Sequence, residues 1–158
     1  MRFHRLLLAI ALALATATAT AAAALPTIVV YKSAYCGCCK LWVEHLRKSG
    51  FRVEVRETEA LDEVKSRVGV PPEQRSCHTA EIAGYFVEGH VPAADIKRLL
   101  KEKPQAKGLA LPGMPVGSPG MEVPGQGTPP YAVELVRMDG STEVFAEHGD
   151  GVGQDAAH

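Results

Sequence analysis

The sequence predicts one α/β domain, and three observations support this prediction. Thr27–Tyr31 reads TIVVY, a β-branched run typical of a buried strand, and it leads directly into a cysteine-rich helix start. Strand-like and helix-like segments alternate after this point. Near the C-terminus, Asp139-Gly140 separates two strand-like runs, which is a strong signal for a β-hairpin.

The first half of the domain follows the order strand, helix, strand, helix. Apolar residues at helical spacing follow the cysteines, and Gly50 ends this first helix. Residues 51–56 alternate apolar and charged side chains, as a half-exposed strand does. Residues 59–68 carry apolar side chains on one helical face, so a second helix is expected there.

The second half is richer in glycine and proline, and its elements are less regular. They are a strand or extended segment at 80–87, a helix from Pro92 to a stop at Pro104, an ordered Gly- and Pro-rich loop at 108–127, a hairpin at 131–147 and a flexible tail at 148–158.

This order of elements is similar to that of thioredoxin-like domains. The cysteine-started helix follows the first strand, and a proline precedes the C-terminal hairpin, as in that fold. We therefore expect a thioredoxin-like metal-binding domain over residues 25–147, with a long insertion between the second helix and the C-terminal β-hairpin. The final helix of the fold has no candidate after the hairpin, because the tail is short and rich in glycine.

The N-terminus has the features of a cleavable signal peptide. Arg2 and Arg5 precede an apolar run at 6–14, and an alanine-rich stretch follows, so residues 1–24 are expected to be removed after Ala24. The run is too short for a membrane anchor. Removal would lower the formal net charge from −1 to −3, because it takes away two arginines and no acidic residue. This charge gives no indication of nucleic-acid binding.

The four cysteines are unevenly placed, since Cys36, Cys38 and Cys39 lie within four residues and Cys77 stands alone. Cys36 and Cys39 form a Cys-x-x-Cys pair at the start of a helix, where exposed amide groups stabilise a thiolate. A bridge between Cys36 and Cys38 would be crowded. Only a bridge between Cys36 and Cys39, or between one of the three and Cys77, is sterically comfortable.

The third clustered thiol favours metal binding over thiol–disulfide exchange. Cys38 would compete with a simple Cys36–Cys39 redox couple, whereas crowded soft thiolates suit Cu(I), which tolerates bridging sulfurs. Zinc is less favoured, because its structural sites usually combine two separated ligand pairs, and only Cys77-His78 could supply the second. Cys77 could instead form a disulfide with a helix thiol.

Several other side chains are candidate ligands with simpler alternatives. Met114 and Met121 lie in the Gly- and Pro-rich loop, where a thioether could bind Cu(I) or fill a gap against the core. His90 could bind metal or hydrogen-bond its loop. Trp42 is expected to be a core residue or to shield the thiols, and His148 is expected to be solvated.

Four stretches together resemble a known family over nearly all of the mature chain. They are YCGCCKLW, CHTAEIAGYFVEGHVPAADIKRLL, GLALPGMPVGSPGME and the closing hairpin. In this order they are similar to the CopG-like copper-resistance proteins of the bacterial periplasm. The resemblance implies a thioredoxin-like domain that holds a cysteine-bridged copper cluster and acts in copper handling or copper redox conversion. It implies Cys36, Cys38, Cys39 and Cys77 as metal thiols, with Met114 as the next candidate.

The leading hypothesis is a periplasmic protein that holds Cu(I) in a multinuclear cluster, in exchange with other periplasmic copper-handling proteins. Conversion between Cu(I) and Cu(II) would make it a copper oxidoreductase. The alternative is a thiol–disulfide oxidoreductase that uses Cys36 and Cys39, and an inert disulfide-stapled module is a third reading. The similarity to thioredoxin-like domains also predicts a cis bond at Pro129 or Pro130, in a loop close to Cys36.

Overall fold

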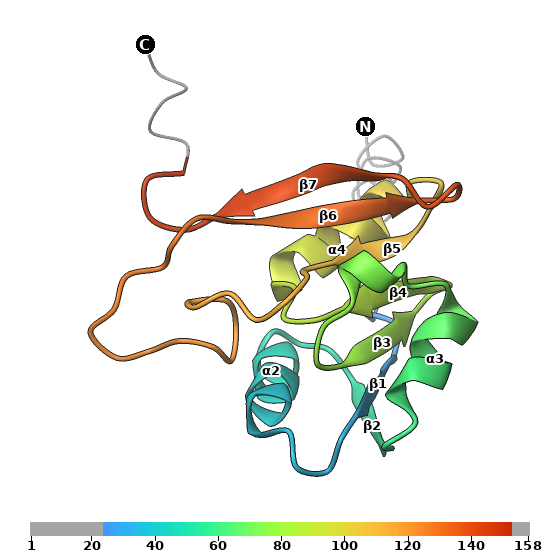
Figure 1. The fold of residues 1–158 in the computed structure, drawn as a ribbon, viewed down its shortest axis with the longest axis horizontal. Coiled ribbons are helices and arrows are strands. Elements are labelled where there is room, and N and C mark those ends of the chain that lie inside the picture. Colours follow the sequence, from blue (N-terminus) through green and yellow to red (C-terminus); the bar gives the residue numbers. More distant parts are fainter. Residues whose placement is uncertain (1–23, 153–158) are drawn as a thin grey trace, which may run out of the picture.

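The computed structural model describes residues 24–152, which form a seven-stranded sheet and three α-helices (Figure 1). The elements are β1 (Ile28–Lys32), α2 (Gly37–Lys48), β2 (Val53–Glu57), α3 (Leu61–Val68), the 3-10 turn η1 (Pro72–Gln74), β3 (Thr79–Ile82), β4 (Tyr85–Glu88), α4 (Ala93–Glu102), β5 (Ala106–Ala110), β6 (Tyr131–Arg137) and β7 (Thr142–His148). The mixed α/β class is therefore confirmed. The predicted signal peptide, apart from Ala24, lies outside the described residues.

The strands lie in the order β2-β1-β3-β4-β5-β6-β7. β1 pairs with β2, and β4 with β5, in parallel, and every other neighbouring pair is antiparallel. No helix among the described residues is long and apolar enough to cross a membrane.

Helices cover both faces of the sheet (Figure 1). Trp42 of α2 and Ile96 of α4 pack with Val87 of β4 in the larger core cluster. The preceding residue of β4, Phe86, points to the opposite face and packs in a smaller cluster with Val70, which follows α3. This alternation along β4 places α2 and α4 on one face and the end of α3 on the other.

The segment predicted at 80–87 is two strands joined by a tight turn. Ala83 and Gly84 both have positive φ, at 49° and 87°, as the two central residues of a type I′ hairpin turn require. The sequence did not reveal this turn, because alanine is unusual at a positive-φ position and the common Asn-Gly or Asp-Gly pair is missing.

The predicted loop at 108–127 begins inside a strand. β5 pairs in parallel with β4, and a Cβ atom added to Gly108 would lie 2.0 Å from the Phe86 carbonyl oxygen. Glycine is therefore required for this close approach and is not the mark of a loop. Residues 111–130 contain no helix or strand, as expected.

The segment between α3 and the C-terminal hairpin was expected to be an insertion, but it supplies the centre of the sheet. β3, β4 and β5 lie side by side between β1 and β6. Helix α4, predicted from Pro92, is confirmed with Pro92 as its N-cap.

The hairpin of β6 and β7 is confirmed, and Gly140 in its turn has φ of 92°. The predicted cis bond at Pro129 or Pro130 is wrong, since residues 24–152 contain no cis peptide bond. That prediction chose the hairpin with the stronger turn signal, whereas β3, beside β1, begins the hairpin that lies close to the cysteines. β7 ends at His148, within the predicted tail, and Asp150 hydrogen-bonds Thr128.

Candidate metal centre

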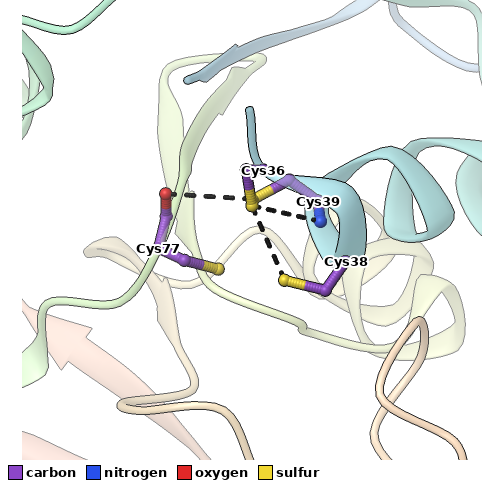
Figure 2. Close-up of side chains that lie close together, drawn as sticks. All are labelled: Cys36, Cys38, Cys39 and Cys77. Atoms are coloured by element: carbon purple, nitrogen blue, oxygen red, sulfur yellow. Dashed lines mark hydrogen bonds between the residues drawn. A yellow bond between two sulfur atoms is a disulfide. The ribbon is translucent and has the colours of Figure 1, made fainter. Parts of the chain in front are cut away.

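The four cysteines meet at one end of β1, although Cys77 is 38 residues from Cys39 in sequence. Cys36 is the N-cap of α2, Cys38 and Cys39 lie in its first turn, and Cys77 directly precedes His78 and strand β3. The four sulfur atoms all lie within 4.8 Å of one another. Figure 2 shows the four side chains gathered at the site. The expected gathering of these side chains is thus present in the geometry.

Cys36 and Cys39 form a disulfide, with their Cα atoms 5.3 Å apart. This is one of the pairings that the sequence left as sterically comfortable. Cys38 and Cys77 are the free cysteines of the described chain, and both are half-buried. The Cys39 amide donates a hydrogen bond to Cys36 Sγ over 3.3 Å, so the first cysteine caps the helix through its sulfur.

Cys77 lies in a poorly solvated position. Burial, and after it the neighbouring Cys38, raises the pKa of the Cys77 thiol to about 11. Cys77 is therefore protonated at neutral pH in the metal-free chain. A metal ion bound there has to displace this proton, because the thiolate is the form that binds metals.

Two buried histidines complete a second group around Cys77. Cys77 Sγ lies 3.1 Å from His90 Nε2 and 3.3 Å from His78 Nδ1. His90 Nδ1 lies 2.8 Å from the Pro119 carbonyl oxygen, which can only accept, so the neutral ring carries its proton on Nδ1. The lone pair of His90 Nε2 then faces the sulfur, which is the orientation of a metal ligand held by an outer partner.

Both imidazoles are held neutral. Burial lowers the pKa of His78 well below its usual value, and the nearby Lys65 ammonium and the basic ring of His90, which disfavour a further positive charge, add to the effect. Burial also lowers the pKa of His90, although its hydrogen bond to Pro119 opposes this shift. Neutral imidazoles are the form that binds metals. His78 Nε2 is buried without a hydrogen-bond partner among the described residues.

Trp42 closes the inner side of the site. Its indole is fully buried, its ring centroid lies 4.3 Å from that of His78 with the planes tilted by 40°, and its Nε1 donates to the Val91 carbonyl over 2.9 Å. The expectation of a core residue is confirmed. His45, one turn further along α2, accepts a hydrogen bond from the Ala93 amide and so caps α4.

The two methionines of the loop lie differently. Met114 is half exposed, and its neighbour Gly113 accepts a hydrogen bond from the Ser76 hydroxyl, next to Cys77. Met121 is partly buried and bonds through its backbone to Gly117 and Ser118. The hydrogen bond between Ser76 and Gly113 therefore brings the loop to the site.

A buried ion pair supports the Cys77 segment from behind. Lys65 Nζ lies 2.6 Å from Glu88 Oε1, and both side chains are almost completely buried. The same carboxylate accepts hydrogen bonds from the Ser76 amide and from the Thr79 hydroxyl, each over 2.6 Å. Glu88 thus fixes the residues on both sides of Cys77-His78.

Sequence reasoning missed this ion pair. Lys65 is an ordinary residue of a helix pattern, and Glu88 is a single charge in the apolar run YFVEGH. That isolated carboxylate was the only available signal, because a charged residue inside a buried strand needs a partner. Burial raises the pKa of Glu88, and Lys65 opposes the shift.

The donor set suits a soft or borderline metal ion. Up to four sulfurs and two imidazole nitrogens converge from α2, the segment before β3 and the segment after β4. Thiolates select Cu(I) and zinc, and imidazole suits copper and zinc, whereas hard ions such as Mg²⁺ and Ca²⁺ prefer oxygen. The residues at the site therefore fit the copper predicted from the sequence.

Comparison with known proteins also points to copper. Two solved structures, described as copper resistance protein CopG in form 1 and form 2, each share 48% identity with this chain. Each match has a TM-score of 0.74 and covers 78% of this chain and 98% of the solved chain. A family model described as protein of unknown function DUF411 matches residues 74–121, and no curated protein matches the chain. The chain belongs to the family of the copper resistance protein CopG.

Proposed function

We propose that this protein binds Cu(I) through Cys36, Cys38, Cys39 and Cys77 and acts in copper resistance. The observation that carries the proposal is the convergence of four sulfur atoms within 4.8 Å of one another. Sulfurs at this separation can bridge neighbouring ions, so the proposed form is a multinuclear cluster and not a single bound ion. The CopG relatives, which are described as copper resistance proteins, support the biological role.

Copper binding by all four sulfurs requires the reduced protein. Cys36 and Cys39 are joined in the structure, and a disulfide sulfur is a poor ligand compared with a thiolate. Two electrons open the bridge and supply two more thiolates at the helix start. His90 and His78 are further candidate ligands beside Cys77, and Met114 remains a candidate from the loop.

The fold supports the thioredoxin-like part of the proposal in a corrected form. Elements β1-α2-β2-α3-β3-β4-α4 follow the thioredoxin order without interruption, with α4 as the final helix. The additional segment is then a C-terminal extension formed by β5, the loop and the hairpin of β6 and β7. In this arrangement, Cys77 stands before the third strand, where the proline of thioredoxin-like domains is expected.

An anaerobic Cu(I) titration against a competing chelator tests the cluster. The reduced protein should bind more than one equivalent, and Cys38→Ser should lower the stoichiometry. Met138→Leu is a matched control, because this exposed methionine lies in the turn of the other hairpin. Saturation at a single equivalent, or unchanged stoichiometry in Cys38→Ser, would contradict the cluster.

Thiol–disulfide exchange is the second candidate function, and the Cys36–Cys39 bridge is the observation that favours it. The two functions differ in their need for Cys38, which is a ligand in the copper cluster but is not required by a dithiol enzyme. A dithiol enzyme should keep its reductase activity in Cys38→Ser, because only the bridged pair reacts. Retained insulin reduction by Cys38→Ser, with no copper bound by the native chain, would select this second function.

The compartment and the redox role are further parts of the proposal. We place the mature protein, beginning at Leu25, in the periplasm, where it exchanges copper with other copper-handling proteins and interconverts Cu(I) and Cu(II). The intact mass of the protein recovered from a periplasmic fraction tests the cleavage site. A full-length mass there would contradict the signal peptide.

A further inference from the structure

Cys38 and Cys77 form a pair that the copper proposal uses only as ligands. Their side chains point toward one another across the site, as Figure 2 shows, and their sulfurs lie within 4.8 Å. Both are free, and both are half-buried. The two thiols come from different segments, the first turn of α2 and the residues before β3.

Elimination among the described cysteines leaves Cys77 as the partner of Cys38. Cys36 Sγ is only 3.5 Å from Cys38 Sγ, but it is already bonded to Cys39. A bridge between residues two apart would also be strained, because their Cα atoms and Cβ directions do not fit a disulfide. Cys38 and Cys77 escape this local restriction, because 39 residues separate them in sequence and their sulfurs nevertheless lie within 4.8 Å.

We propose that Cys38 and Cys77 form a second thiol–disulfide couple beside the Cys36–Cys39 couple. The site then has three redox levels, with four thiols, one disulfide or two disulfides. The structure corresponds to the middle level. Closure requires the two sulfurs to move from within 4.8 Å to a bonding distance of about 2.05 Å.

The oxidant is a disulfide, either of a small molecule or of a partner protein. The Cys38 thiolate attacks one sulfur of that disulfide, which forms a mixed disulfide and releases the first thiolate of the oxidant. Cys77 then attacks Cys38 Sγ, which forms the Cys38–Cys77 bond and releases the second thiolate. The Cys38 proton goes to solvent, and the Cys77 proton goes to His90 Nε2, which lies 3.1 Å from Cys77 Sγ. Two thiols are oxidised, and one disulfide is reduced.

The second couple would control the number of available metal ligands. The fully oxidised level contains no thiolate, so the sulfur ligands of the proposed copper site would be lost in two separate steps. The couple itself rests on the sulfur geometry and not on copper binding. Its test and the copper titration can therefore fail independently.

The variant Cys36→Ser/Cys39→Ser isolates the proposed pair. It is equilibrated with mixtures of reduced and oxidised glutathione, the free thiols are alkylated, and the intact mass is measured. The expected product is a monomer with one internal disulfide. Cys36→Ser/Cys38→Ser, which keeps the fully buried Cys39 with Cys77, is the matched control. Its equilibrium constant for bridging should be at least tenfold smaller.

The native chain provides a second measurement that does not depend on the folding of a variant. After strong oxidation and tryptic digestion, the peptide 33–40 should be joined to the peptide 76–97, and the intact mass should show loss of all four thiol protons. Glutathione adducts, intermolecular dimers, or equal bridging in the control would overturn the second couple. Absence of the joined peptides from the oxidised native chain would overturn it as well.

Discussion

The two hairpins of the sheet differ in burial and in the strength of their sequence signals. β3 and β4 lie in the middle of the sheet, most of their residues are buried, and their turn is an unusual Ala-Gly pair. β7 forms an edge, none of its residues is buried, and its hairpin turns at Asp139-Gly140. Only the first hairpin adjoins the cysteine site, through Cys77 before it and His90 after it.

This difference shows that a strong local signal and a functional position are separate properties. An exposed edge hairpin depends on its turn to set register, so turn residues are informative there. A central hairpin is fixed by neighbours on both sides and can accept a less favourable turn. Four predictions, from the largest expected effect to the smallest, separate the two regions.

Glu88→Ala in the buried hairpin should have the largest effect. It leaves the Lys65 ammonium buried without its partner and frees the Ser76 amide, so the free energy of unfolding should fall by about 3–5 kcal/mol. Urea unfolding followed by circular dichroism measures this loss. A loss below about 1 kcal/mol would mean that water reaches Lys65 and that the ion pair does not fix the Cys77 segment.

Acidification should destabilise the metal-free protein through the same hairpin. Unfolded His78 has a pKa near 6.5, whereas burial keeps folded His78 neutral well below that value. The unfolded chain therefore binds more protons below pH 6.5, and stability falls as the pH falls, by up to about 1.4 kcal/mol for each pH unit. Unfolding at several pH values should show a shallower dependence for His78→Phe. Equal slopes would exclude His78 as the source.

The two turns should respond in opposite directions to substitutions between alanine and glycine. Ala83→Gly should stabilise the protein by about 1 kcal/mol, because alanine at a φ of 49° is strained. Gly140→Ala should destabilise by a similar amount, since its φ is 92°. Thermal unfolding of both variants gives the comparison. Destabilisation by Ala83→Gly would show that the Ala83 side chain contributes more by packing than its backbone loses.

Arg137→Ala in the edge hairpin should have the smallest effect. Arg137 pairs with Glu143 across the two strands, but both side chains are about half exposed. Solvent screens such pairs, so the expected loss is below about 1 kcal/mol, and 0.5 M salt should reduce it further. A loss comparable to that of Glu88→Ala would remove the energetic distinction between the hairpins.

The sequence predicted the elements whose signals are local. The first strand, the cysteine helix, the second strand and helix, and α4 all appear near their expected positions, because periodicity and caps define them. β5 was missed because Gly108 is required for a contact with Phe86, a residue more than 20 positions away. The sequence also did not show that residues 80–87 form the central hairpin, because the order of strands depends on contacts across the whole sheet.

At the site, too, the sequence predicted local features but not the long-range contacts. The cysteine motif predicted the sulfur cluster, and the Cys36–Cys39 bridge was among the allowed pairings. The tautomer of His90 depends on the Pro119 carbonyl, and the support of Cys77 depends on Glu88 and Lys65. No spacing within the sequence indicates these partners, because they come from the loop, from strand β4 and from helix α3 on the other face of the sheet.

The contact between His90 and Pro119 also divides the site between two parts of the chain. Residues up to Lys103 contain all four thiols, the ion pair and every element of the proposed thioredoxin-like unit. They lack the carbonyl that orients His90 and the strand β5 that covers the edge of β4. The sulfurs are therefore supplied by the N-terminal unit alone, whereas the orientation of the imidazole beside them depends on residue 119 of the C-terminal extension.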